Sequence, residues 1–162
     1  MCSSDLTIVP GGLEHLLLGA IPREATILSY LHRNFSNVLD VHLAPGGVCR
    51  YHLYIKIRKR LPAEAMNIIM AAFSSHFDVK HVIVVDEDVN IHDPQHVEWA
   101  IATRFQANKD LIVVPVTQGS RLDPSADDGV SAKMGLDATR PLNWTGPQYT
   151  VIRVPEIGRA HV

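Results

Sequence analysis

The segment from Lys80 to Arg104, KHVIVVDEDVNIHDPQHVEWAIATR, decides the fold class of this chain. It begins with a continuous apolar run at 81–85, which is typical of a strand covered on both faces. The run ends in acidic residues, and Asp93-Pro94 then supplies a helix N-cap followed by proline at the first helical position. The pattern predicts a buried strand that leads into a helix ending near Arg104.

A second apolar run follows this helix. Leu111 to Val114 reads LIVV, and two apolar strands that flank one helix imply a right-handed crossover between parallel strands. We therefore expect an α/β fold with a mixed, largely parallel sheet and helices packed on it, in which the runs at 82–85 and 111–114 are central. The loop at 118–125, rich in glycine, serine and aspartate, lies beyond a strand's carboxyl end, where ligands bind in open sheets.

The first half of the chain predicts further elements of such a fold. A helical pattern runs from Pro22 to about Asn34, and a strand is expected from Val38 to Leu43. A turn at 45–47 (PGG) precedes residues 51–58, where apolar and polar side chains alternate. The alternation predicts a strand with one buried face and one polar face.

The helix expected from Pro62 to Phe77 is apolar on more than one side. One stripe holds Met66, Ile69, Met70, Phe73 and Phe77, and another holds Ala65, Ile68 and Ala72. Such a helix needs cover on more than one side. Two interpretations stay open: central burial within this domain, or contact with another subunit or a missing domain. Expressed alone, the chain is expected to self-associate or to be poorly soluble.

Composition places the chain among ordinary globular proteins. With 162 residues, 46% hydrophobic and 20% charged, it suits one domain with one core. A formal charge of −2 without a basic stripe makes nucleic acid an unexpected partner. The apolar runs are far shorter than the roughly 20 residues of a membrane span. Cys49 has no expected partner, which favours an inert thiol and a reducing, cytoplasmic location.

The two ends of the chain lack the periodicity of a strand or helix. The codons GTG-TGC-TCT-TCC-GAT-CT would encode residues 1–6, and their reverse complement, slightly extended, would encode residues 156–162. We interpret both ends as translated sequencing adapter and expect the folded domain to span residues 7–155.

Several blocks of the sequence resemble one known family. The segments VIVVDEDVNIHDPQHVEWAIATR, DLIVVPVTQGSRLDPSA and AKMGLDATRP, with GGLEHLLLGAIPREATILSYL upstream, are similar in order and spacing to the C-terminal domain of the UbiD-like decarboxylases, of the 3-octaprenyl-4-hydroxybenzoate carboxy-lyase type. The resemblance covers roughly residues 10 to 145 and rests on the combination of blocks.

The resemblance implies non-oxidative decarboxylation of aromatic or α,β-unsaturated carboxylic acids with prenylated FMN and a divalent metal ion. The catalytic network and metal ligands of that family lie in an upstream flavin-binding domain, so this fragment is expected to be inactive alone. It would contribute to the pocket wall and to contacts in a homo-oligomer. The alternative is a stand-alone α/β oligomerisation or small-ligand-binding module. An enzyme of nucleotide-binding type is less favoured, because the chain lacks GxGxxG and GxxxxGK followed by serine or threonine.

The same resemblance implies the candidate site residues. Lys133, in a loop reading AKMGLDAT, is expected to face the flavin phosphate, whereas its bare sequence context favours a solvated loop lysine. Asp137 and Thr139 would lie towards the substrate, and residues 118–122 would form part of the pocket wall.

An acidic cluster between the first strand and the helix of the opening segment has two interpretations. Its members could supply oxygen and nitrogen ligands to a metal, but their spacing matches no metal motif. We favour a solvated turn in which Asp93 caps the helix, and we expect Trp99 to pack between elements. The cluster consists of Asp86, Glu87, Asp88, His92, Asp93 and His96.

Overall fold

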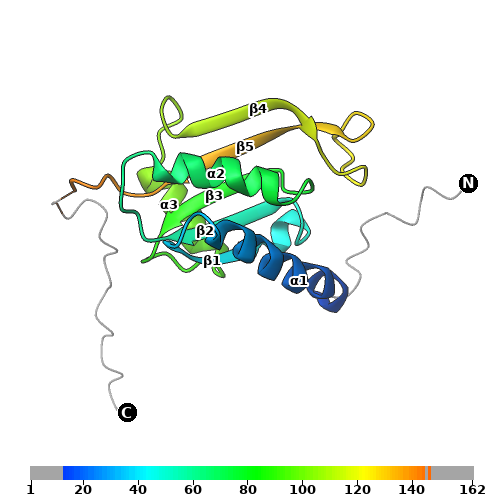
Figure 1. Ribbon diagram of the computed structural model, residues 1–162, viewed down its shortest axis with the longest axis horizontal. Helices are drawn as coiled ribbons and strands as arrows, with labels where there is room; N and C mark the ends of the chain where they lie inside the picture. Colours follow the sequence, from blue (N-terminus) through cyan, green and yellow to red (C-terminus); the bar gives the residue numbers. More distant parts are fainter. Residues whose placement is uncertain (1–12, 145, 147–162) are drawn as a thin grey trace, which may run out of the picture.

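The structure is a computed structural model that describes residues 13–144 and 146. Five strands form one sheet in the order β1-β2-β3-β5-β4 (Figure 1). The elements in chain order are α1 (Leu13–His32), β1 (Val38–Leu43), the short 3-10 helix η2 (Pro45–Gly47), β2 (His52–Ile57), α2 (Glu64–Ser75), β3 (His81–Asp86), α3 (Pro94–Arg104), β4 (Leu111–Gln118) and β5 (Val130–Ala138).

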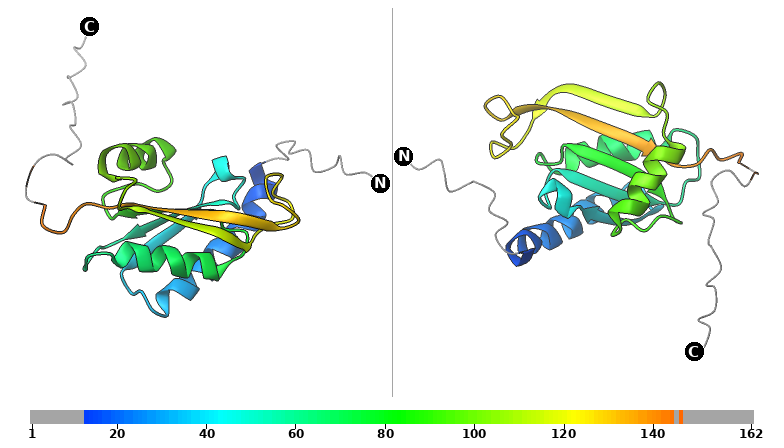
Figure 2. Two further views of the ribbon diagram at one scale, coloured as in Figure 1. Left: turned by 90° about the horizontal axis from the view of Figure 1, so that it is seen from above. Right: turned by 180° about the vertical axis from the view of Figure 1, so that it is seen from behind.

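The sheet is mixed, as predicted. Strands β2, β3 and β5 run parallel to one another, and β1 and β4 pair antiparallel at the two edges. Helices α1 and α2 cover one face and α3 covers the other, so the fold has three layers (Figure 2). Each face carries its own cluster of buried apolar residues. The α/β fold class is confirmed.

Strand β3 is central, and the prediction for its apolar run is confirmed. Residues 82–85 are buried, because helices cover both faces of the sheet at this strand. The prediction that 111–114 is also central and parallel is wrong. β4 is an edge strand that forms an antiparallel hairpin with β5, and β5 takes the place beside β3. Pro115, which has no N–H to donate, is tolerated in β4 because the strand is at an edge.

Two helix boundaries differ from the predictions. α1 begins at Leu13, and Pro22 lies inside it rather than at its start. Proline removes a hydrogen bond to the carbonyl of Leu18, but the Leu18 side chain is 75% exposed, so water can reach this turn. α2 begins at Glu64, whose carboxylate accepts hydrogen bonds from the backbone N–H groups of Arg60 and Leu61.

The two apolar stripes of α2 have different environments. Ala65, Ile68 and Ala72 are buried, together with Ile69, so the sheet-facing side is covered within this domain. α2 packs tightly on β5 at Gly135, where an added Cβ would collide with the Ile69 side chain. In the first stripe, Met66 and Phe73 are half-buried against this core, whereas Met70 and Phe77 remain exposed.

The alternation predicted for β2 is confirmed for Leu53, Ile55 and Ile57, which are buried. Cys49 is buried as well, in agreement with an inert thiol. The expectations for residues 1–6 and 156–162 lie outside the described residues. Among residues 13–144 and 146, no helix combines the length and apolar character that crossing a bilayer requires.

Candidate functional site

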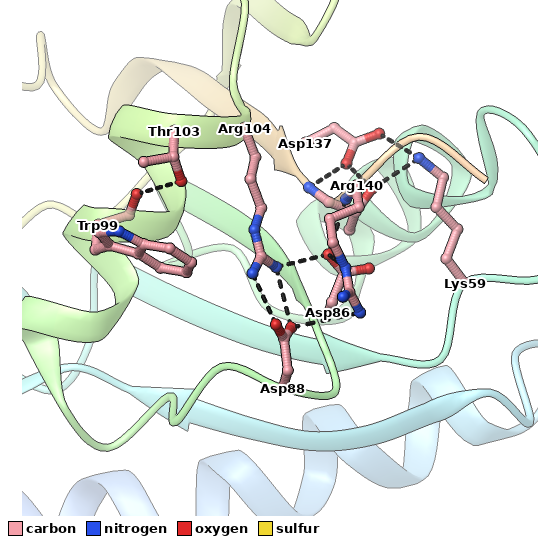
Figure 3. A network of polar contacts seen from close by, with 9 residues as sticks. Lys59, Asp86, Asp88, Trp99, Thr103, Arg104, Asp137 and Arg140 are labelled. Atoms are coloured by element: carbon pink, nitrogen blue, oxygen red, sulfur yellow. Dashed lines mark hydrogen bonds and ion pairs between the residues drawn. The ribbon is translucent and has the colours of Figure 1, made fainter. Parts of the chain in front are cut away.

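The carboxyl ends of the three parallel strands meet at one edge of the sheet. Because β2, β3 and β5 run in the same direction, the residues that follow Ile57, Asp86 and Ala138 gather there. Figure 3 shows that charged side chains from these three strand ends lie close together. This edge is where an open α/β sheet binds ligands.

Lys59 is held at this edge by two residues from the end of β5. Its Nζ donates a hydrogen bond to Thr139 Oγ1 at 2.7 Å and lies 3.6 Å from Asp137 Oδ2. Thr139 in turn donates to Asp137 Oδ1 through both its backbone N–H and its hydroxyl. Asp137 and Thr139 are buried, so their main effect is to fix the ammonium group of Lys59.

A cavity of about 390 Å³ opens beside this triad. Lys59, Lys109 and Asp137 supply its charged wall with Asp110, while Met66 and the segment 141–143 supply apolar surface. The two lysines are balanced in formal charge by Asp110 and Asp137, so the cavity offers ammonium donors to a phosphate or carboxylate rather than a net positive charge.

A second charged network lies next to the first and is structural. The Arg104 side chain, which is fully buried, donates to Asp86 Oδ2 at 2.7 Å and to both Asp88 oxygens at 3.0 and 2.8 Å. Its guanidinium stacks over the Trp99 ring at 5.0 Å. Arg140 adds a backbone N–H bond of 2.8 Å to Asp86 Oδ2 (Figure 3). Trp99 is half-buried and packs against the apolar cluster that α3 shares with β3 and β5, as predicted.

The two carboxylates of this network respond differently to their surroundings. Burial raises the pKa of Asp86 above its ordinary value, against the opposing influence of Arg140 and Arg104. Burial alone would also raise the pKa of Asp88, but hydrogen bonds and charge from Arg104 outweigh it and the pKa lies below its ordinary value. Asp93 caps α3 through a bond from the Gln95 N–H, as predicted. The prediction of a solvated turn is wrong for Asp86, which is buried against two arginines.

The structure does not place Lys133 on a loop, so that expectation is wrong. The residues AKMGLDA belong to β5, and the Lys133 side chain is buried. Its Nζ donates to the carbonyl oxygens of Phe77 at 2.8 Å and Val79 at 2.6 Å. Burial lowers the pKa of this ammonium group below that of an ordinary lysine. Lys133 thus ties the turn before β3 to β5.

The predicted site residues do not all come together. Lys133 and Asp137 are four residues apart on an extended strand, which separates them by about 13 Å. Residues 118–122 line another cavity, of about 810 Å³, at the amino ends of the parallel strands. Only Asp137 and Thr139 lie at the carboxyl edge.

Comparison with known proteins identifies the family of this chain. Residues 16–138 match the family model described as the 3-octaprenyl-4-hydroxybenzoate carboxy-lyase C-terminal domain. The chain belongs to this UbiD family. Among curated relatives, anhydromevalonate phosphate decarboxylase of Aeropyrum pernix is 50% identical over 149 residues, which are 92% of this chain and 34% of the relative. The enzyme of the same name from Methanothermobacter thermautotrophicus is 43% identical over 136 residues, 83% of this chain and 32% of the relative.

Solved UbiD structures share the fold. The UbiD-class enzyme HmfF from Pelotomaculum thermopropionicum, in complex with FMN, has a TM-score of 0.84 at 53% identity and covers 89% of this chain and 32% of its own. Apo 3,4-dihydroxybenzoic acid decarboxylase (AroY) of Klebsiella pneumoniae has a TM-score of 0.76 at 27% identity, covering 88% and 31%. The chain therefore spans about a third of the length of these relatives.

Sequence reasoning missed three residues of this UbiD domain's charged edge: Lys59, Arg104 and Arg140. A signal for Lys59 exists, since it belongs to the basic run that directly follows the alternating segment 51–58. The contact between Lys59 and Asp137 depends on which strands are neighbours in the sheet. The periodicity of a single segment does not predict this strand order.

A substitution at Lys133 tests its structural role. Lys133→Met leaves the buried carbonyl of Val79 and the part-buried carbonyl of Phe77 without a charged donor, so we expect the free energy of unfolding to fall by about 1.5–3 kcal/mol. Urea denaturation followed by circular dichroism would measure this. Lys109→Met is the control, because Lys109 is exposed and its side chain makes no hydrogen bond among the described residues, while the bond from its backbone N–H to Gln106 is unaffected by the substitution. Equal stability of the two variants would contradict the role given to Lys133.

The loop between β4 and β5 predicts a response to acid. The Asp123 carboxylate, which is buried, accepts from Lys80 Nζ at 2.6 Å and from Ser125. Burial opposes ionisation, but these hydrogen bonds prevail and lower the pKa of Asp123. The resulting stability is therefore present above the unfolded pKa of about 4 and is lost as pH falls through the folded pKa.

Asp123→Asn should flatten this acid dependence and cost about 1–2 kcal/mol at neutral pH, measured by urea unfolding at several pH values. Asp127→Asn, at an exposed carboxylate with no side-chain partner among residues 13–144, should change neither quantity. Parallel pH profiles for the wild-type chain and Asp123→Asn would refute the assignment.

Proposed function

We propose that this chain is the C-terminal part of a carboxy-lyase that decarboxylates aromatic or α,β-unsaturated carboxylic acids with prenylated FMN. The relatives' names support the reaction class, because they describe decarboxylases of anhydromevalonate phosphate and of 3,4-dihydroxybenzoic acid. HmfF structures in complex with FMN and with prFMN support the cofactor. We extend the cytoplasmic location and the homo-oligomer to this protein as part of the same proposal, and a dimeric form of HmfF supports the latter.

The observation that carries the proposal is the lysine-lined cavity at the carboxyl edge. Lys59 and Lys109 present positive charge to a cavity of about 390 Å³, and Asp137 with Thr139 holds Lys59 in place. This donor set fits the phosphate of a flavin or an anionic group of the substrate. Asp137 and Thr139 would thus act on the substrate side, as the sequence predicted, mainly by positioning Lys59.

Prenylated FMN, when bound, supplies the electron sink for the bond that breaks as carbon dioxide leaves. The residues of this chain would bind and orient the anionic ligand and exclude water from one side of the pocket. We place the divalent metal and the proton donor in the upstream flavin-binding domain, because Asp86 and Asp88 are already engaged by Arg104. The predicted contact of Lys133 with the flavin phosphate stays a prediction, and Lys59 and Lys109 are better placed for that charge.

Carbon dioxide release tests the proposal directly. The chain alone, supplied with prenylated FMN, should show no release from any unsaturated acid, because one wall of a pocket cannot hold the reacting groups. Joined to its upstream flavin-binding domain, it should decarboxylate at least one of anhydromevalonate phosphate and 3,4-dihydroxybenzoate. Turnover by the isolated chain would overturn the division of labour. Failure of the joined protein to bind flavin or release carbon dioxide would favour the stand-alone binding module.

A further inference from the structure

A separate cavity of about 300 Å³ lies between the first half of α1 and the turn that precedes β2. In Figure 1 this turn, drawn in cyan, lies beside the start of α1. Two guanidinium groups line the cavity, one from Arg23 on α1 and one from Arg50. Apolar surface comes from Leu16, Leu18 and Val48. We call it the arginine-lined cavity.

A buried carboxylate fixes the position of both arginines. Asp78, in the turn between α2 and β3, is buried, and its Oδ2 lies 3.2 Å from Arg50 Nη1 and 3.9 Å from Arg23 Nη2. Asp78 Oδ1 has no hydrogen-bond partner among residues 13–144 and 146, so neither guanidinium is engaged in a bidentate pair. The carboxylate therefore holds the two side chains while leaving most of their N–H groups unused.

These unused N–H groups are available to a ligand. A guanidinium carries five N–H donors. Within the part of the chain that the structure describes, the Arg50 side chain donates one hydrogen bond and the Arg23 side chain donates none. The two side chains are 30% and 21% exposed, so a ligand can reach them, yet they are partly sheltered from salt. Such donors beside a cavity are suited to an oxyanion, which only accepts hydrogen bonds.

The charges around the two arginines leave an excess of positive charge. Glu24, the next residue after Arg23, is turned towards β1, where it accepts from the Leu43 N–H at 2.6 Å. Burial lowers the pKa of His76, which keeps this ring neutral at neutral pH. The charge of Asp78 opposes this shift and those of the arginines reinforce it. Two guanidinium groups thus share one carboxylate.

We propose that the arginine-lined cavity binds a small organic phosphate, a phosphate monoester with a short aliphatic body. Such a phosphate carries a charge close to −2 at neutral pH and offers three oxygens to the two guanidinium groups. The aliphatic body would lie on Leu16, Leu18 and Val48. A nucleotide fits less well, because the cavity is at the small end of ligand sites and none of the described residues that line it is aromatic.

This site is independent of the lysine-lined cavity. Arg50 precedes β2 whereas Lys59 follows it, so the two cavities lie at opposite ends of a six-residue strand about 20 Å long. A ligand bound by Arg23 and Arg50 would join α1 to the turn before β2. Its role would be to stabilise this part of the domain and not to take part in decarboxylation.

Isothermal titration calorimetry of the 162-residue chain with n-butyl phosphate and with inorganic phosphate tests the proposal. Both ligands should bind saturably. Each methylene group that is buried on binding contributes about fourfold in affinity, so n-butyl phosphate should bind at least about tenfold more tightly. Lys59→Met should leave this difference unchanged, because Lys59 is not in the arginine-lined cavity.

Two substitutions address the cavity itself. Arg23→Met should weaken binding of n-butyl phosphate by at least about tenfold, the effect of losing a hydrogen bond from a charged donor. Gly19→Leu should abolish binding by filling the cavity while both arginines remain. An added Cβ at Gly19 meets only Arg23 Nη1, at 3.9 Å, and leucine favours a helix more than glycine does, so the fold should be retained.

Arg33→Met is the matched control. Arg33 directly follows α1, is exposed and makes no ion pair with any residue in the ranges 13–144 and 146. Its substitution removes the same charge and should leave the affinity for n-butyl phosphate within about twofold. Circular dichroism of each variant verifies that it folds.

Absence of saturable binding at about 10 mM ligand would overturn the proposal. Equal affinities for the two ligands would overturn the aliphatic body, and binding lost in Lys59→Met but kept in Arg23→Met would overturn the location. Binding that disappears when the chain is joined to its upstream domain would assign the arginines to that domain's acidic groups and also overturn the proposal. None of these measurements involves flavin or carbon dioxide, so the decarboxylase proposal keeps its own test.

Discussion

Replacing Arg104 by methionine should lower the free energy of unfolding by about 3–5 kcal/mol, more than any other substitution considered for this domain. The Arg104 side chain is fully buried, and it is the charged partner of the buried Asp86 and of Asp88. Without it, Asp86 would remain as a buried carboxylate with only the Arg140 contacts. Urea denaturation at neutral pH would measure the loss.

The pH dependence of this loss has a defined sign. Burial already raises the pKa of Asp86, and removing Arg104 should raise it further. A raised folded pKa gives stability that is present at low pH and lost as pH rises through that pKa. The deficit of Arg104→Met should therefore shrink as pH is lowered from neutrality towards 5.

Arg58→Met is the matched control. Arg58 pairs with Glu87 at 2.8 Å, but the two side chains are 66% and 46% exposed, so the loss should stay below about 1 kcal/mol. If Arg104→Met were no more destabilising than Arg58→Met, the network around Asp86 would not be a structural element of the fold.

The parts of the fold that local sequence predicts are those with strong local signals. β3 has a continuous apolar run, and α3 has a cap residue with proline at its first position, so both were predicted correctly. β4 was misplaced because a short β-branched run is compatible with either a central or an edge strand. The position of β4 in the sheet is decided by its hairpin partner β5. Gly135 of β5 leaves room for α2, and the sequence of β5 read alone resembles a loop.

The candidate site shows the same limit. Asp137 and Thr139 are expected at the site through resemblance, and both lie at the carboxyl edge of the parallel strands, while their role towards a substrate stays a prediction. Lys59 is 78 positions away from Asp137, and only the parallel pairing of β2, β3 and β5 brings the two together. Lys133 illustrates the converse, since its sequence neighbours suggest a loop whereas its ammonium group is bound by carbonyls from a distant turn.

Lys59→Met, in the chain joined to its upstream flavin-binding domain, should reduce kcat/KM for decarboxylation by about 10- to 100-fold. A hydrogen bond from a charged donor contributes about 1.5–3 kcal/mol, which corresponds to this range, and the ligand's anionic group would lose it. If Lys59 binds the flavin phosphate, flavin retention should fall; if it binds the substrate, KM should rise while flavin stays bound. Lys56→Met is the control, because Lys56 is half-buried in the same strand region and does not line the cavity. Lys56→Met should change kcat/KM by less than about threefold. Equal effects of the two substitutions would mean that the lysine-lined cavity has no specific role in the reaction.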